Sequence, residues 1–185
     1  MQKSTPFFTS VYFSDLTTPL DQLEQSILDF KDHNPITEQR SNRYGWQSKP
    51  FAQSKLFMNE LMKEVLEEIK QVYDDLGITT TPKLGNYWFN VNNKYSYNTS
   101  HTHPGCLISS VLYITAPLNS GALVLERPDD FHRHIYQYSP NENNIGRIIQ
   151  EPRKGLMVTF PSYVRHQVEM SQSDESRISI AFNFI

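Results

Sequence analysis

The spacing of apolar residues in the first eighty positions predicts a short strand followed by two helices. The strand is expected in the aromatic-rich stretch Phe7–Phe13. Two later stripes recur at steps of three and four, the period of a helix face: Leu20, Leu23, Ile27 and Phe30, then Met58, Leu61, Met62, Val65, Ile69, Val72 and Leu76. We expect Thr18 and Pro19 to cap and open the first helix, and Gly77 to end the second. Residues 40–48, rich in polar and turn residues, are expected to form a loop.

From Lys83 onward the pattern changes to short runs of β-branched and aromatic residues, separated by Pro, Gly or Asn about every ten positions. Strands are predicted at residues 84–91, 106–115, 121–125, 134–138, 147–150, 155–160, 167–170 and 177–184. So many short strands within about a hundred residues are typical of a jelly roll or a small barrel. We therefore expect a mainly β fold with two flanking N-terminal helices packed on the outer face of one sheet.

The composition is that of one globular domain. Of the 185 residues, 38% are apolar, which is enough to build a single core, and no Pro/Gly/Ser-rich linker divides the chain. We expect residues 1–185 to form a single domain. Within it, residues 1–80 would supply the first strand and the supporting helices, and residues 84–185 would form the jelly-roll core.

Charge and motif content exclude several classes of function. Seventeen Lys and Arg against twenty Asp and Glu leave a net charge of −3, so no nucleic-acid partner is expected. No apolar run approaches the roughly 18 residues of a membrane span, so no membrane role is expected. The seven glycines lie too far apart for a G-x-G-x-x-G motif, a P-loop or a G-x-S-x-G elbow. The single cysteine, Cys106, permits no internal disulfide; it is expected to be a small strand residue, and the compartment to be reducing and cytoplasmic.

Most histidines fall in the strand-rich half: His101, His103, His132, His134 and His166. His101 and His103 stand at the mouth of the predicted strand 106–115, and on an extended backbone residues two apart face the same side. Two imidazoles about 7 Å apart at Cα can share one first-row metal ion. His132 and His134 follow a loop-like stretch, and we expect them at the surface.

The last histidine is followed by an arginine and a serine on the last predicted strand. His166 lies after a strand that ends in a turn, and ten residues separate it from Arg177, with Ser179 two positions further on. An inward-facing arginine there needs an anion, and its fork of N–H groups suits a carboxylate. The alternative is a surface ion pair with Asp174 or Glu175.

This H-x10-R-x-S pattern, downstream of an H-x-H pair, resembles the double-stranded β-helix oxygenases that use Fe(II) and 2-oxoglutarate. The resemblance spans roughly residues 86–185, and this part of the sequence is similar to a subfamily found in bacteria and their viruses. It is carried by residues 98–105, Tyr113 within 111–114, Ser120-Gly121, 160–162 and 177–183. The resemblance implies a cupin-like, metal-binding jelly-roll core.

The resemblance also implies a set of site residues and a reaction. The metal ligands for Fe(II) would be His101, His103 and His166, and the residues on the far carboxylate of 2-oxoglutarate would be Arg177, Ser179 and, by analogy with prolyl hydroxylases, Tyr113. The implied enzyme is a dioxygenase that takes O2, hydroxylates an unknown substrate, a small molecule or a peptide side chain, and releases succinate and CO2. The loop residues expected to face that substrate are Arg43, Trp46 and Gln47.

One residue departs from the family pattern. In most of these oxygenases the second residue after the first histidine is Asp or Glu, and here it is His103. An imidazole in place of a carboxylate leaves the metal one unit more positive. Either His103 binds as a third imidazole, or only His101 and His166 bind and water completes the coordination. Glu126 and Asp129 are further candidate carboxylate ligands.

Two other functions fit the same residues. A three-histidine cupin-like enzyme would bind its substrate directly on the metal without 2-oxoglutarate, with Arg177 on the acid group of the substrate. A metal-free jelly-roll module would bind a sugar or a protein partner through an aromatic surface made of Tyr87, Trp88, Tyr95 and Tyr97.

Overall fold

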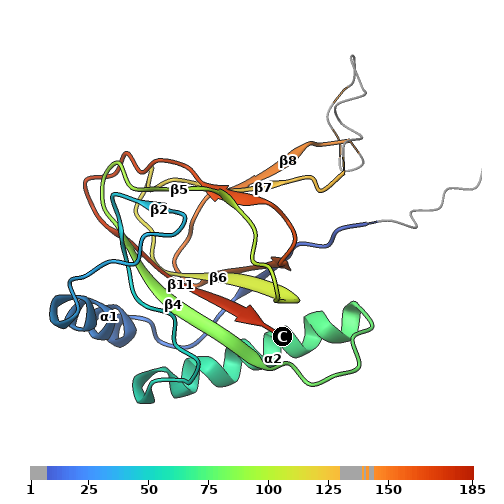
Figure 1. The fold of residues 1–185 in the computed structure, drawn as a ribbon, viewed down its shortest axis with the longest axis horizontal. Coiled ribbons are helices and arrows are strands. Elements are labelled where there is room, and N and C mark those ends of the chain that lie inside the picture. The colour runs from blue at the N-terminus through green and yellow to red at the C-terminus, as the bar shows by residue number, and fades with distance from the viewer. Residues whose placement is uncertain (1–7, 130–138, 140, 142–143) are drawn as a thin grey trace, which may run out of the picture.

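The computed structural model describes residues 8–129, 139, 141 and 144–185, which form two β-sheets with two helices on one side (Figure 1). The helices are α1 (Asp21–His33) and α2 (Asn59–Asp75), the second preceded by a 3-10 turn, η1 (Leu56–Met58). The strands are β1 (Tyr12–Asp15), β2 (Asn42–Arg43), β3 (Trp46–Gln47), β4 (Leu84–Asn92), β5 (Tyr97–His101), β6 (Ile108–Thr115), β7 (Leu123–Glu126), β8 (Arg147–Gln150), β9 (Leu156–Pro161), β10 (His166–Val168) and β11 (Arg177–Phe184).

The strands divide into a larger and a smaller antiparallel sheet. The larger has the order β1-β9-β6-β11-β4-β3, and the smaller has the order β2-β5-β10-β7-β8. In Figure 1 the smaller sheet lies above the larger one, and the helices lie below it. This arrangement confirms the prediction of a mainly β jelly roll with two N-terminal helices on one sheet.

The helices pack on the larger sheet because one face of its central strands β4 and β11 is apolar. In β11, Ile178, Ile180 and Phe182 are buried in one apolar cluster with residues of both helices, such as Ile27 and Val65. The polar positions between them in the strand point to the other side of the sheet. The larger sheet therefore has an apolar face under the helices and a partly polar face toward the smaller sheet.

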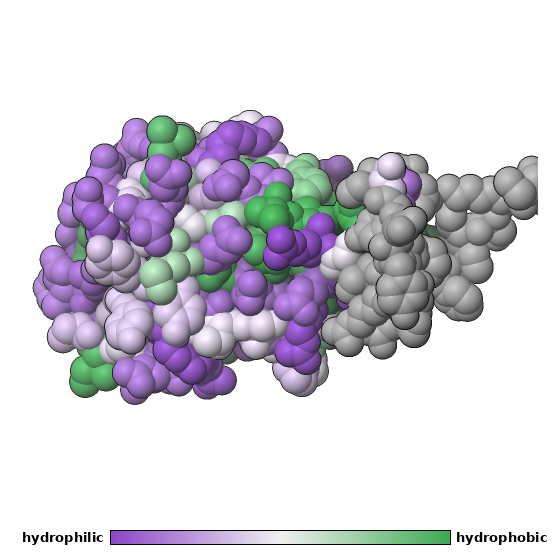
Figure 2. Space-filling model, turned by 90° about the horizontal axis from the view of Figure 1, so that it is seen from above, coloured by the Kyte–Doolittle hydropathy of each residue, from purple (hydrophilic) through white to green (hydrophobic). Residues whose placement is uncertain are grey.

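The smaller sheet faces the partly polar side of the larger sheet. A second apolar cluster joins its Leu123 and Leu125 to Tyr113, Val158 and Phe160 of the larger sheet. Seen from above, the outward side of the smaller sheet is mainly hydrophilic, with one apolar area beside the residues drawn in grey (Figure 2). No helix in the described part of the chain is long and apolar enough to cross a membrane.

The start of α1 differs from the prediction, whereas the end of α2 agrees with it. α1 begins at Asp21, and the residue at its N-cap, Leu20, has no side chain that can cap the helix. Thr18, the predicted cap, instead donates its hydroxyl hydrogen bond to Glu64. At the end of α2, Gly77 has a φ of +70°. The Gly77 and Ile78 amides donate to the carbonyls of residues 74 and 73, which is a Schellman motif.

Most strands predicted after Lys83 are present with ends shifted by one or two residues. The first strand was expected at Phe7–Phe13 and is β1 at Tyr12–Asp15, and two further regions differ. Residues 40–48 contain the short strands β2 and β3, and β5 (Tyr97–His101) was not predicted. β5 is rich in Asn, Thr and Ser rather than apolar residues, so its pattern resembles a loop. Cys106 lies two residues before β6 rather than within a strand. The predicted strand 134–138 lies outside the described residues.

A single carboxylate ties the segment before α1 to α2. Glu64 Oε1 accepts hydrogen bonds from the Thr17 amide and hydroxyl at 2.6 and 2.7 Å, and Oε2 accepts them from the Thr18 amide and hydroxyl at 2.9 and 2.5 Å. Burial alone would raise the pKa of Glu64, but these four bonds favour the charged form and lower the pKa from 4.5 to about 2. The ionised carboxylate therefore stabilises the folded state.

We predict that Glu64→Gln lowers the free energy of unfolding by about 1 to 2 kcal/mol at pH 7, less than full linkage would give because the group is partly exposed. Since the folded-state pKa is depressed, this contribution is present above pH 4.5 and is lost as the pH falls toward about 2. Urea denaturation at pH 7 and pH 3 measures it. The control is Glu67→Gln, at an exposed position on α2 about one helical turn after Glu64. Equal stability of the two variants at pH 7 would contradict the prediction.

Candidate metal and cosubstrate site

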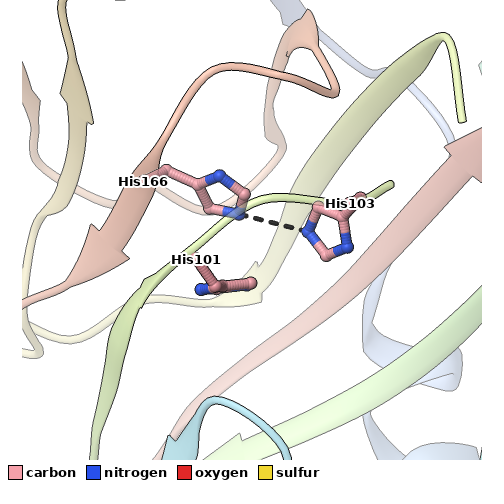
Figure 3. Close-up of side chains that lie close together, drawn as sticks. All are labelled: His101, His103 and His166. Carbon is pink, nitrogen blue, oxygen red and sulfur yellow. Dashed lines mark hydrogen bonds between the residues drawn. The ribbon is translucent and has the colours of Figure 1, made fainter. Parts of the chain in front are cut away.

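Three histidines from two strands and a turn meet between the sheets. His101 is the last residue of β5, His103 lies in the turn that follows, and His166 opens β10. His166 and His101 are direct partners in the antiparallel ladder. One ring nitrogen of each histidine lies within 4.8 Å of the others, and the three rings point toward a common space (Figure 3). Backbone pairing therefore brings together residues that are more than sixty positions apart.

Hydrogen bonds to the backbone orient two of the rings. Nδ1 of His101 lies 2.7 Å from the Thr99 carbonyl and Nδ1 of His166 lies 2.9 Å from the Val164 carbonyl. Because a carbonyl only accepts, each Nδ1 carries the proton and each Nε2 keeps its lone pair. Nε2 of His103 lies 3.2 Å from Nε2 of His166 (Figure 3). This is the arrangement of nitrogens that a shared metal ion requires.

Burial keeps the three imidazoles neutral. It lowers the pKa of His101, lowers that of His103 to about 4 and that of His166 to about 3, and a charge on one ring would oppose a charge on the next. The ring of Trp88 lies 5.5 Å from that of His103, and the ring of Phe160 lies 4.8 Å from that of His166. Neutral imidazoles in an aromatic surround are ready to ligate a metal at neutral pH.

Arg177, the first residue of β11, is buried in the same cavity. Only 2% of it is exposed. Its Nη1 donates to the carbonyls of Ser120 and Gly121 at 2.8 and 2.7 Å, while its Nε has no partner among the described residues. The alternative of a surface ion pair is wrong, because Arg177 is buried and Asp174 pairs with Lys94 at 2.7 Å. A buried guanidinium with a free N–H is a site for an anion.

Gly121 is required for the position of that arginine. Its φ is +91°, and a Cβ on it would lie 2.2 Å from the Glu169 carbonyl oxygen and 3.4 Å from Nη1 of Arg177. Any other residue would displace the backbone whose carbonyls hold the guanidinium. The Ser120-Gly121 pair thus fixes the direction in which the remaining N–H groups of Arg177 point.

Tyr113 and Ser179 flank Arg177. They are direct partners across β6 and β11, and Ser179 is two positions from Arg177, on the same side of the strand. Burial raises the pKa of Tyr113 to about 12, so its hydroxyl stays protonated and can donate. A cavity joins this cluster to the histidines; the six residues that line it from these two clusters are His101, His103, His166, Arg177, Ser179 and Tyr113.

Several other expectations about the site fail. Trp46 and Gln47 are buried and do not line the cavity, and Trp46 donates instead to the Asn34 carbonyl. Of the same segment it is Ser41 that lines the cavity, while Arg43 is exposed and donates to backbone carbonyls. Of residues 40–48, it is therefore the beginning of the segment, and not its middle, that lines the cavity.

The candidate carboxylate ligands lie outside the histidine group. Leu125 is the ladder partner of His166, so Glu126, one position on, faces the other side of the sheet, where it accepts a hydrogen bond from Ser100. Asp129 pairs with Arg127. His132 and His134 lie outside the described residues. Burial raises the pKa of the Cys106 thiol, which does not favour a nucleophile.

The aromatic surface of a metal-free binding module is not present. Tyr87 is fully buried on the helix side of β4, whereas Trp88 lines the cavity on the opposite side. Tyr95 is exposed, and Tyr97 is partly buried on β5. These four rings face different directions, so they offer no common surface.

The sequence interpretation missed a polar wall on β4. Trp88, Asn90 and Asn92 line the cavity, and they alternate with the buried Tyr87, Phe89 and Val91 of the helix side. The period-two pattern is visible in the sequence and could have identified this wall. Asn98 of β5, which donates to Ser41 at 3.1 Å, lines the cavity from the smaller sheet.

The donors of this cavity fit Fe(II) and 2-oxoglutarate. Imidazole nitrogen is a good ligand for Fe(II), and three Nε2 atoms on one side leave room for other ligands. The unpartnered N–H of Arg177 suits a carboxylate at the other end of the cavity. A dicarboxylate could therefore span from the histidines to the arginine.

Comparisons with known proteins agree with this chemistry. Residues 86–183 match the family described as "Putative 2OG-Fe(II) oxygenase". A search of curated protein sequences finds no match. Among solved structures, a Pseudomonas putida prolyl-4-hydroxylase has a TM-score of 0.64 at 16% identity, over 95% of this chain and 92% of that one.

Two further solved structures share the fold. A prolyl hydroxylase from Trichoplax adhaerens has a TM-score of 0.65 at 13% identity, over 96% of this chain and 83% of that one. HygX from Streptomyces hygroscopicus, with nickel and 2-oxoglutarate bound, has a TM-score of 0.62 at 11% identity, over 95% and 82%. The match over more than half of the chain shows that this protein belongs to the 2OG-Fe(II) oxygenases, the double-stranded β-helix enzymes that use Fe(II) and 2-oxoglutarate.

Proposed function

We propose that this protein is a dioxygenase that hydroxylates a C–H bond of a small molecule or a peptide side chain, with 2-oxoglutarate converted to succinate and CO2. The observation that carries this proposal is the presence, in one cavity, of three convergent neutral histidines and a buried arginine without an anionic partner. The packing of the core does not explain the arginine, because a buried charge without an anionic partner is costly.

In this proposal His101, His103 and His166 hold the metal. The Thr99 and Val164 carbonyls keep the Nδ1 protons of His101 and His166 in place, so both rings present Nε2. His103 contributes the third nitrogen in place of the carboxylate that most family members have. Its ring contact with Trp88 limits rotation, which favours ligation by His103 over replacement by water.

Arg177, Ser179 and Tyr113 bind the far carboxylate of 2-oxoglutarate. The free Nε of Arg177 donates to it, and the hydroxyls of Ser179 and Tyr113, which line the same cavity, are further donors. Because Nη1 is already engaged by two backbone carbonyls, the guanidinium cannot rotate away when the carboxylate leaves. The arginine is therefore positioned before the ligand arrives.

Fe(II), with 2-oxoglutarate and O2, supplies the oxidising chemistry when bound. The chain's own residues orient the cosubstrate, exclude water through Trp88 and Phe160, and keep the imidazoles unprotonated. Among the structural neighbours, the Trichoplax prolyl hydroxylase is in complex with a hypoxia-inducible-factor peptide fragment, and HygX also occurs with hygromycin B bound. Both a peptide side chain and a small molecule are therefore compatible with this fold.

We predict that the purified protein binds about one Mn(II) or Fe(II) per chain, and that His101→Ala or His166→Ala weakens binding at least about 100-fold, because each removes a ligand oriented by the backbone. His103→Ala is expected to weaken it about 10-fold or more, since water replaces one imidazole. Anaerobic calorimetry measures the affinities. The control is His33→Ala, on the exposed end of α1. Wild-type affinity in all three site variants would contradict the metal assignment.

Substitution of Arg177 tests the use of 2-oxoglutarate. Arg177→Met removes a charge-assisted contact worth about 2 to 5 kcal/mol, so 2-oxoglutarate affinity is expected to fall roughly 30-fold to several-thousand-fold while metal affinity barely changes. Arg177→Lys should recover only part of the loss, because an ammonium lacks the fork. Anaerobic titration of the Mn(II)-loaded variants gives both numbers.

The matched control is Arg153→Met, which removes an arginine that is exposed and paired with Asp15. It should leave 2-oxoglutarate binding unchanged. Unchanged affinity in Arg177→Met would overturn the cosubstrate pocket. Metal binding by the wild type without any 2-oxoglutarate binding would favour instead a three-histidine enzyme that binds its substrate directly.

A further inference from the structure

The cavity of the site contains positive charge and no acidic side chain. Its only ionised lining residue in the described part of the chain is Arg177. The three histidines that face the metal position bind as neutral ligands. No Asp or Glu of the described residues lines the cavity: Glu126 faces the outer side of the smaller sheet, and Glu151 is exposed. The protein therefore supplies no negative charge to balance a metal ion.

A count of charges in the loaded site gives a surplus. A divalent metal and Arg177 bring three positive charges, and 2-oxoglutarate brings two negative ones. A carboxylate in place of His103 would make the sum zero, but the imidazole leaves one positive charge. An unbalanced charge in a cavity lined by Trp88 and Phe160 is costly, so the site favours one further anion.

The β4 wall offers hydrogen-bond donors for such an anion. Asn92 is 2% exposed and Asn90 is partly buried; both line the cavity, and neither side chain has a hydrogen-bond partner among the described residues. They lie directly across from Arg177 and Ser179 in the β4–β11 ladder. Trp88 lies on the same side of β4 as these amides, and its ring contacts that of His103. The wall therefore connects the arginine end of the cavity to the metal end.

We propose that the substrate is itself an anion, whose carboxylate or phosphate group sits against the β4 wall, balances the extra charge that His103 leaves on the metal and accepts N–H bonds from Asn90 and Asn92. This inference rests on the proposed function, because the surplus charge exists only when metal and 2-oxoglutarate are both bound. A neutral substrate would leave that positive charge unbalanced.

The test uses the full chain loaded with Mn(II) and saturated with 2-oxoglutarate, under anaerobic conditions and in a buffer without halide. Acetate and inorganic phosphate are the anionic probes, and acetamide is the neutral probe of matched size. Calorimetry and the Mn(II) electron paramagnetic resonance spectrum report binding without turnover. We expect at least one of the anions to bind ten or more times more tightly than acetamide.

Two variants add a negative charge to the cavity by different routes. His103→Asp supplies the carboxylate to the metal, and Asn92→Asp places one on the β4 wall. Each is expected to weaken binding of the anionic probe at least tenfold. The control Asn93→Asp adds the same charge at the next residue, which is exposed and accepts a hydrogen bond from Ser176, and it should change the affinity less than twofold.

The outcomes separate this inference from the proposed function. If 2-oxoglutarate does not bind the Mn(II)-loaded wild type, the proposed function fails. If 2-oxoglutarate binds but acetate, phosphate and acetamide bind with equal affinity, only the inference of an anionic substrate is overturned. Anion binding that persists in both His103→Asp and Asn92→Asp, with metal content and thermal melting confirming folded protein, also overturns it, because charge would then not govern the site.

Discussion

The two-residue period of the central strands is the constraint on which the rest of the structure depends. From Tyr87 on β4 and from Ile178 on β11, every second side chain is apolar and packs under the helices, and the side chains between them face the smaller sheet. A shift of one residue in the β4–β11 register would bury Asn92 and Arg177 under α1 and α2 and expose the core. The same alternation therefore fixes the fold and supplies the polar wall of the cavity.

Charge determines what this cavity can hold. Arg177 is kept in place by backbone carbonyls that neutralise none of its charge, so its stability in the core depends on an anion or on solvent in the cavity. His103 removes the negative charge that most family members place on the metal. The two features together make the site more electropositive than a carboxylate-containing one, and this property connects cosubstrate binding to the choice of substrate.

Much of this was accessible from the sequence, and the rest depended on contacts between distant segments. Helical spacing located α1 and α2, and the spacing of His166, Arg177 and Ser179 pointed to the cavity that the structure contains. The position of β5 could not be predicted, because its polar residues are held by pairing with β2 and β10 rather than by their own pattern. Likewise, the Thr99 carbonyl that orients His101 leaves no trace in residue identity.

The central claim is that one cavity holds a metal on three histidines and a dicarboxylate on Arg177. An anaerobic crystal structure with Mn(II) and 2-oxoglutarate, with the metal located by anomalous scattering, tests it most directly. We expect Mn(II) within about 2.3 Å of Nε2 of His101, His103 and His166, and the far carboxylate on the free N–H groups of Arg177. A metal bound elsewhere, or a carboxylate that leaves Nε of Arg177 without a partner, would contradict it.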